Sequence, residues 1–211
     1  MNIASVLAMV GDEPLFPSSL LLSGNESIPR VRLQLSRWVK AGKLLQLRRG
    51  LYAFAPAWRK VEPHPFVIAN AMHRGSYVSL QAALAYYAAI PEHVPTVTSV
   101  GPGRPEVVRN LLGTFALNHV AGSMLFGYSR IEVAPRQFAF VASPEKALLD
   151  LVYLTRGADA PAYLRELRLQ NPGEFHTKTL LDLAARTAKP KLVRAAQHAV
   201  RLLADEEGEA N

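Results

Sequence analysis

The sequence has no cysteine, which excludes disulfide bonds, thiolate zinc sites and cysteine nucleophiles. It also has no apolar run approaching the ~18 residues that a membrane-spanning helix needs. Nor does it begin with a positively charged segment followed by an apolar one, which is the pattern of a secretory signal. These absences predict a cytoplasmic protein that makes no membrane contact.

The residues that are abundant indicate packed domains and an anionic partner. The 211 residues are 49% hydrophobic, which is enough for a packed core, and the length suits two small domains. Lys and Arg number 24 against 17 Asp and Glu, which gives a formal net charge of +7. Whether this excess indicates a specific anionic partner depends on where the charges lie.

The positive charge gathers in two stretches of the sequence. Every charged residue from Ser27 to Lys60 is Lys or Arg, and the stretch from Arg186 to Arg201 also lacks Asp and Glu. An acidic tail, placed at residues 206–211, follows the second stretch. Such clusters are the electrostatic footprint of phosphate-backbone binding. The second stretch is more simply a solvated helix face, whereas local architecture strengthens the functional interpretation of the first.

Three helices open the first predicted domain. The first two cover about 2–10 and 17–22, from the spacing of their apolar residues. The third begins at Ser27, a suitable N-cap, and has Pro29 in its first turn, where a missing N–H has no cost. It ends just before Gly42, because glycine readily adopts the left-handed conformation that terminates a helix.

The third helix has an apolar face and a basic face. Val31, Leu35 and Trp38 are spaced by three or four residues and are expected to face inward, with Val39 beside them. The outward face carries residue types that read base edges or bind phosphates. Its residues are Arg30, Gln34 and Arg37, flanked by Arg32, Ser36 and Lys40.

A β-hairpin is predicted over 43–54, because two short runs flank the turn Arg48-Arg49-Gly50. Two helices, a basic helix and a basic hairpin form a winged helix-turn-helix domain, which we place at residues 1–60. The third helix would enter the major groove of DNA, and the hairpin would contact the backbone or the minor groove. The alternative is a winged helix that makes only protein contacts. The predicted DNA-binding residues are Arg30, Arg32, Gln34, Arg37, Lys40, Lys43, Arg48 and Arg49.

A proline-rich connection leads to a second domain, predicted over 64–205. Helices come first, then four short runs rich in β-branched or aromatic residues, then helices again from Ser143 onward. The four runs are expected to form a small antiparallel sheet. They cover 96–100, 113–117, 129–133 and 138–141, and the later helices cover 144–154, 162–169, 180–187 and 191–203. The whole chain is thus predicted to be an α+β protein, with the winged helix-turn-helix followed by a larger α+β domain.

The sequence offers no persuasive active site, so we expect no enzymatic activity, metal or cofactor. Its histidines never pair at metal-ligand spacing. The segment 101–105, Gly-Pro-Gly-Arg-Pro, lacks the Gly-Lys-Ser/Thr ending of a phosphate-binding loop, and is expected to be a turn. Glu145 and Asp150 lie five residues apart and not on one helix face, and are expected to have capping and surface roles.

Three motifs together resemble the AbiEi family of type IV antitoxins. The first is the end of the predicted winged helix, Arg49-Gly50-Leu51-Tyr52. The second is Tyr-Val-Ser-Leu-Gln-Ala-Ala-Leu at 77–84 with Ile-Pro-Glu at 90–92, and the third is Ala-Ser-Pro-Glu-Lys-Ala-Leu-Leu-Asp at 142–150. The motifs occur in the family's order and span most of the chain. The region after residue 160 matches no motif.

The resemblance implies a transcriptional autorepressor and antitoxin of an abortive infection system. The N-terminal domain would bind inverted repeats in its own promoter, with two protomers or successive binding on the double-stranded DNA. The second domain would oppose a nucleotidyltransferase-like toxin encoded alongside. The resemblance assigns no catalytic residue, and Tyr77, Ser79 and the Pro144-Glu145 helix start are interpreted as fold signatures. By position, it implies DNA contacts at Arg30, Gln34, Arg37, Arg48 and Arg49.

A second function stays open. The protein is then a stand-alone winged-helix regulator, or a protein-interaction module, without a cognate toxin. The gene beside it would distinguish an antitoxin from an orphan regulator.

Overall fold

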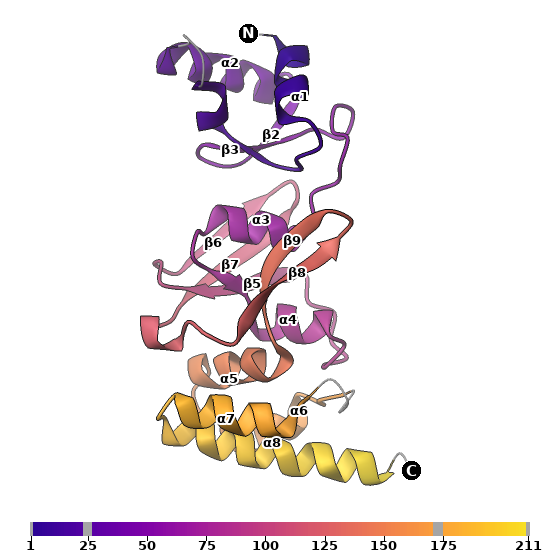
Figure 1. Ribbon diagram of the computed structural model, residues 1–211, viewed down its shortest axis with the longest axis vertical. Coiled ribbons are helices and arrows are strands. Elements are labelled where there is room, and N and C mark those ends of the chain that lie inside the picture. The colour runs from indigo at the N-terminus through magenta and orange to yellow at the C-terminus, as the bar shows by residue number, and fades with distance from the viewer. Residues whose placement is uncertain (1, 23–26, 171–174, 210–211) are drawn as a thin grey trace.

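The computed structural model describes residues 2–22, 27–170 and 175–209. In these residues the chain has a mixed α/β fold with a three-stranded antiparallel sheet and a six-stranded mixed sheet. The molecule is elongated: the small sheet and the N-terminal helices lie at one end, the large sheet in the middle and the C-terminal helices at the other end (Figure 1). The predicted combination of helices and sheets is confirmed.

The N-terminal elements follow the predicted order. Gly42 has a φ of +66°, the left-handed conformation expected just after the third helix. Ser27 occupies the N-cap position of that helix but makes no capping hydrogen bond through its side chain. The second predicted helix forms as a 3-10 helix. The elements are α1 (Ile3–Val10), β1 (Phe16–Pro17), η1 (Ser18–Leu22), α2 (Ile28–Lys40), β2 (Leu44–Arg48) and β3 (Leu51–Phe54).

These elements enclose a hydrophobic core of their own. Val31, Leu35 and Trp38 of α2 are buried, as the helical spacing predicts. They belong to one cluster with Phe16 and Phe54, whose rings lie 5.3 Å apart. The outward face of α2 is therefore left for charged side chains.

The large sheet has the strand order β6-β7-β5-β4-β9-β8. All four predicted runs form strands, and two further strands, β4 and β6, add to them. The strands are β4 (Tyr77–Val78), β5 (Thr96–Gly101), β6 (Glu106–Asn110), β7 (Gly113–His119), β8 (Tyr128–Ala134) and β9 (Gln137–Ala142).

The prediction of an antiparallel sheet is wrong for two strand pairs. β5 runs parallel to β7, and β4 runs parallel to β9 where Val78 pairs with Val141. The parallel pair arises because β6 forms an antiparallel hairpin with β7 and takes the sheet edge, so that β7 lies between β6 and β5. β6 carries Glu106, Arg109 and Asn110, which suit an edge strand but do not form an apolar run.

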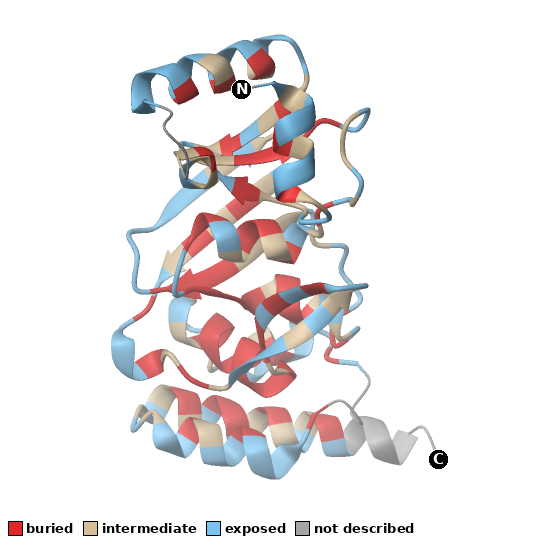
Figure 2. Cartoon of the chain, turned by 45° about the horizontal axis from the view of Figure 1, so that its top comes forward, coloured by how far each residue is buried: buried red, intermediate tan, exposed pale blue. Residues whose placement is uncertain are grey.

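Helices flank the large sheet and form the C-terminal end. Figure 2 shows buried residues concentrated on the central strands and helices, and exposed residues on the outer faces of the terminal helices. Every residue of α5 from Pro144 to Val152 is buried. The helices are α3 (Pro65–Met72), α4 (Leu80–Tyr86), α5 (Pro144–Leu154), α6 (Pro161–Glu166), α7 (Thr177–Arg186) and α8 (Pro190–Glu209), with a 3-10 helix η2 (Gly122–Met124).

Helix α8 extends further than the sequence predicts. It continues to Glu209, beyond the expected end at residue 203, so the predicted acidic tail at 206–211 begins inside the helix. Residues 210 and 211 of that tail lie outside the described residues.

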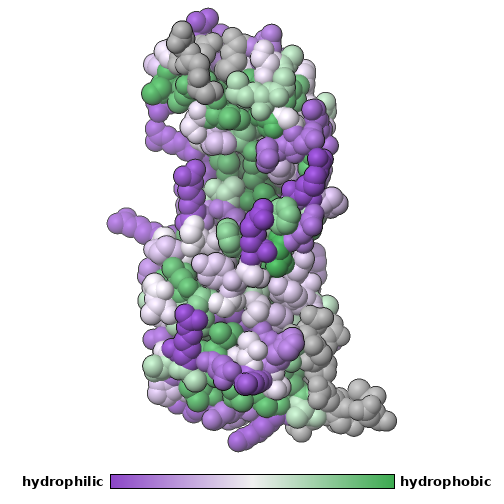
Figure 3. Space-filling model, in the orientation of Figure 1, coloured by the Kyte–Doolittle hydropathy of each residue, from purple (hydrophilic) through white to green (hydrophobic). Residues whose placement is uncertain are grey.

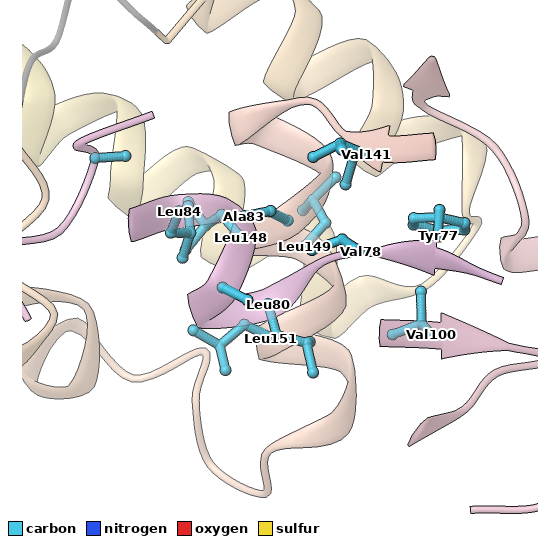
Figure 4. Packing of buried hydrophobic residues seen from close by; sticks show 14 of the residues in the cluster. Tyr77, Val78, Leu80, Ala83, Leu84, Val100, Val141, Leu148, Leu149 and Leu151 are labelled. Carbon is cyan, nitrogen blue, oxygen red and sulfur yellow. The ribbon is translucent and has the colours of Figure 1, made fainter. Parts of the chain in front are cut away.

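The larger core joins the sheet to α4 and α5. Figure 4 shows Val78 of β4 and Val141 of β9 near Leu149 of α5, and Val100 of β5 belongs to the same buried cluster. Helices α4, α7 and α8 also pack against α5, so the helix is enclosed by helices as well as by the sheet.

Asp150 is fully buried, which corrects the surface role expected for it. Its Oδ1 forms a salt bridge with Nζ of Lys146, which is also fully buried. Its Oδ2 accepts hydrogen bonds from the Tyr77 hydroxyl at 3.0 Å and from the Ser79 hydroxyl at 2.8 Å. A buried carboxylate is tolerated where its oxygens are paired in this way.

Glu145 is also buried, so its expected surface role is wrong as well. Its Oε1 accepts the backbone N–H of His176 at 2.7 Å. That hydrogen bond joins the first turn of α5 to the residue that precedes α7. The carboxylate therefore connects two helices.

Candidate nucleic-acid interface

A groove lies between α2 and the β2–β3 hairpin, and its volume is about 640 Å³. Arg32 and Lys40 of α2 line one side, and Arg49 of the hairpin lines the other. Ser36 and Gln46 also line it, and none of its lining residues is acidic. We call this feature the basic groove. Three guanidinium or ammonium groups around one concave surface give it a positive potential, which attracts anions.

The helical period of α2 produces one side of the basic groove. Val31, Leu35 and Trp38 face the core, and Arg32 and Ser36, each next in sequence to one of these residues, are turned away from it and are exposed. Lys40 follows one turn after Ser36 on the same side. The sequence predicts these positions correctly because they depend on local spacing alone.

The hairpin produces the other side. The backbone N–H of Ser18 donates a 2.8 Å hydrogen bond to the carbonyl of Gly50, which fixes the hairpin turn against η1. Gly50 has a φ of +82°, as the turn requires. Gln46 of β2 adds an amide to the groove. The sequence analysis does not propose Gln46 as a contact, although it is a polar residue among the leucines of β2.

The other predicted contacts on α2 lie outside the groove lining. Arg30 and Arg37 are exposed, and Gln34 is half-buried. Lys43 lies after the helix, with its Nζ 5.0 Å from the centre of the Trp58 ring in a cation–π contact. The predicted contacts on α2 thus fall into two groups. Arg32 and Lys40 line the basic groove, and Arg30, Gln34 and Arg37 lie elsewhere on the helix.

Arg48 is directed away from the basic groove. Its Nη1 donates to the backbone carbonyl of Met72 and lies 3.5 Å from Oε1 of Glu106. The pairing register of β2 shifts between Gln46 and Arg48, next to the turn that places Arg49 in the groove. The structure therefore does not bring Arg48 together with the groove residues, and instead joins it to the large sheet.

The second basic stretch of the sequence makes contacts within the fold. The Arg186 guanidinium lies 4.2 Å from the centre of the Phe126 ring, and Nη2 of Arg194 lies 2.7 Å from Oδ2 of Asp159. Nζ of Lys191 donates to a backbone carbonyl at 2.6 Å. These charges hold the C-terminal helices to the rest of the molecule, a structural role for this stretch.

Burial raises the pKa of Tyr52, which lines the basic groove, and the other perturbed groups named here lie away from it. Burial raises the pKa of Asp150 and lowers the pKa of Lys146. Burial also lowers the pKa of His73, which lies at the end of α3. Asp150 and Lys146 are wholly enclosed. Their charges therefore affect the stability of the fold and do not contact a ligand.

In the described parts of the chain, no group of three or more His, Cys, Asp or Glu side chains could hold a metal ion. In those same parts, no helix combines the length and the apolar character needed to cross a membrane.

Neither a protein-family model nor a curated protein matches this chain. Among solved structures, it is similar to the crystal structure of the RV2827C protein from Mycobacterium tuberculosis, with a TM-score of 0.53. The two sequences are 14% identical, and the match covers 96% of this chain and 79% of the other. At this identity the likeness concerns the fold alone.

Proposed function

We propose that this protein is a DNA-binding transcriptional autorepressor that also acts as the antitoxin of a type IV system of the AbiEi kind. The observation that carries the proposal is the basic groove, where Arg32, Lys40 and Arg49 converge from a helix and a hairpin. Phosphate groups of DNA are the natural counterpart of such a surface.

The N-terminal part is proposed to be a winged helix-turn-helix domain over residues 1–60, followed by the antitoxin-type domain over 64–205. In this assignment α2 is the recognition helix and the β2–β3 hairpin is the wing. Supporting it are the element order, the separate N-terminal core and the exposed basic face of α2.

The two groups of residues on α2 would have different tasks. Arg30, Gln34 and Arg37 would face the base edges in the major groove, where Arg recognises guanine and Gln recognises adenine. Arg32, Lys40 and Arg49 would bind phosphates beside them. Two protomers would cover an inverted repeat, since one such domain spans only a half-site.

The antitoxin part of the proposal rests on the resemblance of the motifs at 77–84 and 142–150. Its partner would be a nucleotidyltransferase-like toxin. Three motif residues, Tyr77, Ser79 and Asp150, meet in one buried network. This supports the interpretation that the motifs maintain the fold and do not themselves contact the toxin.

A protein-interaction module is the second candidate, and one observation favours it. Ile28 and Leu33 of α2 are apolar yet 49% and 53% exposed, on the helix that would read DNA. Exposed apolar side chains of this kind suit a protein partner or the methyl groups of thymine.

The experiment that tests the DNA-binding proposal compares two triple variants of equal charge. Arg32→Ala/Lys40→Ala/Arg49→Ala removes the basic groove, and Arg109→Ala/Arg156→Ala/Arg165→Ala removes three exposed charges elsewhere. Duplex affinity is measured across a salt series. The groove variant should lower the slope of log K against log salt by about 0.9 for each lost phosphate contact, and the control should keep the wild-type slope. Equal slopes for both variants would reject the basic groove as the DNA-binding surface.

A further inference from the structure

A second charged cavity lies where the N-terminal part meets the large sheet. Its volume is about 430 Å³. Arg48 reaches it from β2, while His73 and Arg74 come from the end of α3, and Arg104 and Glu106 come from the β5–β6 loop and β6. We call it the junction cavity. It is distinct from the basic groove, with which it shares no lining residue.

The charges of the junction cavity are unbalanced. Arg48 lies 3.5 Å from Glu106, the only carboxylate in the lining. Arg74 and Arg104 are exposed and make no ion pair or hydrogen bond with the described residues. Two guanidinium groups are therefore left without a counter-charge in one concave site. A guanidinium group can bind a phosphate or carboxylate in a bidentate manner.

His73 adds to the lining a buried nitrogen without a hydrogen-bond partner in the described parts of the chain. Its side chain is only 5% exposed, and its Nδ1 lies 3.2 Å from Oε1 of Glu106. Its Nε2 is buried and has no hydrogen-bond partner among the described residues. An unsatisfied buried polar atom is rare in a folded protein and requires an explanation. Here it belongs to a side chain that lines the junction cavity.

The loop that forms one wall is closely packed and restrained. A Cβ on Gly101 would lie 2.9 Å from Cβ of Ser76, and one on Gly103 would lie 3.0 Å from Cδ2 of Leu117. Nδ1 of His119 also lies 3.1 Å from the Gly103 carbonyl oxygen. The glycines thus permit a close approach that fixes the backbone of this wall next to Arg104.

We propose that the junction cavity binds a small phosphorylated sugar. Arg74 and Arg104 bind the phosphate, with Arg48 beside them. Glu106 accepts a hydrogen bond from a sugar hydroxyl, because a carboxylate is an acceptor and repels further phosphates. Met72 and Leu117 provide apolar contact in the lining. The volume falls within the range of cavities that hold small ligands.

Glu106 also distinguishes this ligand from a DNA backbone. A sugar phosphate offers hydroxyl groups that can donate to Glu106 beside its phosphate, whereas the backbone of a DNA duplex has none. The basic groove, by contrast, has no acidic lining residue. The proposal does not rest on the proposed function, because the ligand is small and its binding is read out without DNA.

The test is calorimetric titration of the full chain with ribose 5-phosphate, inorganic phosphate and ribose as separate probes. Ribose 5-phosphate should bind more tightly than either of the other two. The Arg74→Gln/Arg104→Gln variant should bind ribose 5-phosphate about tenfold or more weakly than the wild type, since two charge-assisted contacts are lost. The Arg109→Gln/Arg156→Gln control, with the same charge change at exposed sites outside the cavity, should leave it unchanged.

Further probes identify the ligand more closely, and some of their results would reject the proposal. Adenosine 5′-monophosphate replaces ribose 5-phosphate in a parallel titration. Tighter binding of adenosine 5′-monophosphate would show that the sugar phosphate recognised is part of a mononucleotide. Glu106→Gln should reduce the preference for ribose 5-phosphate over inorganic phosphate. No heat of binding at about 10 mM probe, or equal binding by wild type and the Arg74/Arg104 variant, would overturn the proposal. Weaker duplex binding by that variant, with no sugar phosphate bound, would assign the cavity to DNA and overturn it equally.

Discussion

The Ser79 hydroxyl donates a 2.8 Å hydrogen bond to Asp150, which lies 71 residues away in the sequence. This contact joins the start of α4 to the middle of α5, and Tyr77 donates to the same carboxylate. Two segments that resemble a family motif therefore meet around one buried charge. These hydrogen bonds explain how the two segments pack together, and they assign no function to the motif residues.

Asp150→Asn tests the importance of this buried charge. The substitution keeps the volume of the side chain but leaves the Lys146 ammonium without its counter-charge in the core. We expect the free energy of unfolding to fall by about 3 kcal/mol, because breaking a buried pair leaves an uncompensated charge. Urea unfolding measures it. Asp182→Asn, at an exposed position of α7, should change it by less than about 0.5 kcal/mol. For Asp150→Asn, a change as small as that of the control would contradict the stabilising role of the buried pair.

Gly127→Ala should destabilise the protein more than Gly157→Ala. Both glycines have a positive φ, +71° and +74°, so both substitutions should cost about 1 kcal/mol in backbone strain. A Cβ on Gly127 would also lie 3.0 Å from Cγ of Lys146, whereas nothing lies within 4 Å of one on Gly157. Crowding should add about 1 kcal/mol or more at Gly127. Equal thermal or urea stabilities of the two variants would show that Lys146 moves freely.

His73 should titrate below its ordinary pKa of 6.5, because burial disfavours the imidazolium more than Glu106 favours it, and Arg48 opposes it too. The folded protein then binds this proton less readily than the unfolded chain. The contribution of neutral His73 to the free energy of unfolding is thus fully present above pH 6.5. It is lost as the pH falls from 6.5 through the folded-state pKa of His73. NMR titration of the imidazole measures the pKa, and His73→Gln should lessen the acid sensitivity of unfolding. A folded-state pKa of 6.5 or higher would contradict this prediction.

Two single variants should separate base reading from phosphate binding. Arg37→Ala should reduce the affinity for the preferred duplex by ~1–3 kcal/mol and affect other sequences less, if Arg37 contacts a base. Arg49→Ala, in the basic groove, should weaken binding to all duplexes and lower the salt slope by about one unit. Fluorescence anisotropy with the preferred and a scrambled duplex measures both. The assignment fails if the two variants lose the same affinity on both duplexes.

The sequence predicts the elements whose signals are local. The three N-terminal helical segments and the hairpin follow from apolar spacing, Gly42 and the Gly50 turn, and the outward side of α2 carries the predicted charges. Arg32, Lys40 and Arg49 are accordingly predicted as contacts and do lie together.

The features that depend on distant partners are not predicted. β4 has only two residues and exists because β5 and β9 pair with it. Asp150 looks like a surface residue until Lys146, Tyr77 and Ser79 are seen around it. Arg48 and Arg49 are indistinguishable as sequence, yet one joins the large sheet and the other the basic groove. The junction cavity likewise assembles from segments that no spacing rule connects.

The most direct test of the central claim is a competition assay with DNA taken from upstream of the protein's own gene and a scrambled duplex of equal length. The account predicts that the upstream duplex is preferred by ~10³-fold or more, the lower end of specific recognition. It also predicts that the Arg32/Lys40/Arg49 variant loses binding to both duplexes. Equal and steeply salt-dependent binding of the wild-type protein to both duplexes would contradict the autorepressor, and would favour the protein-interaction module.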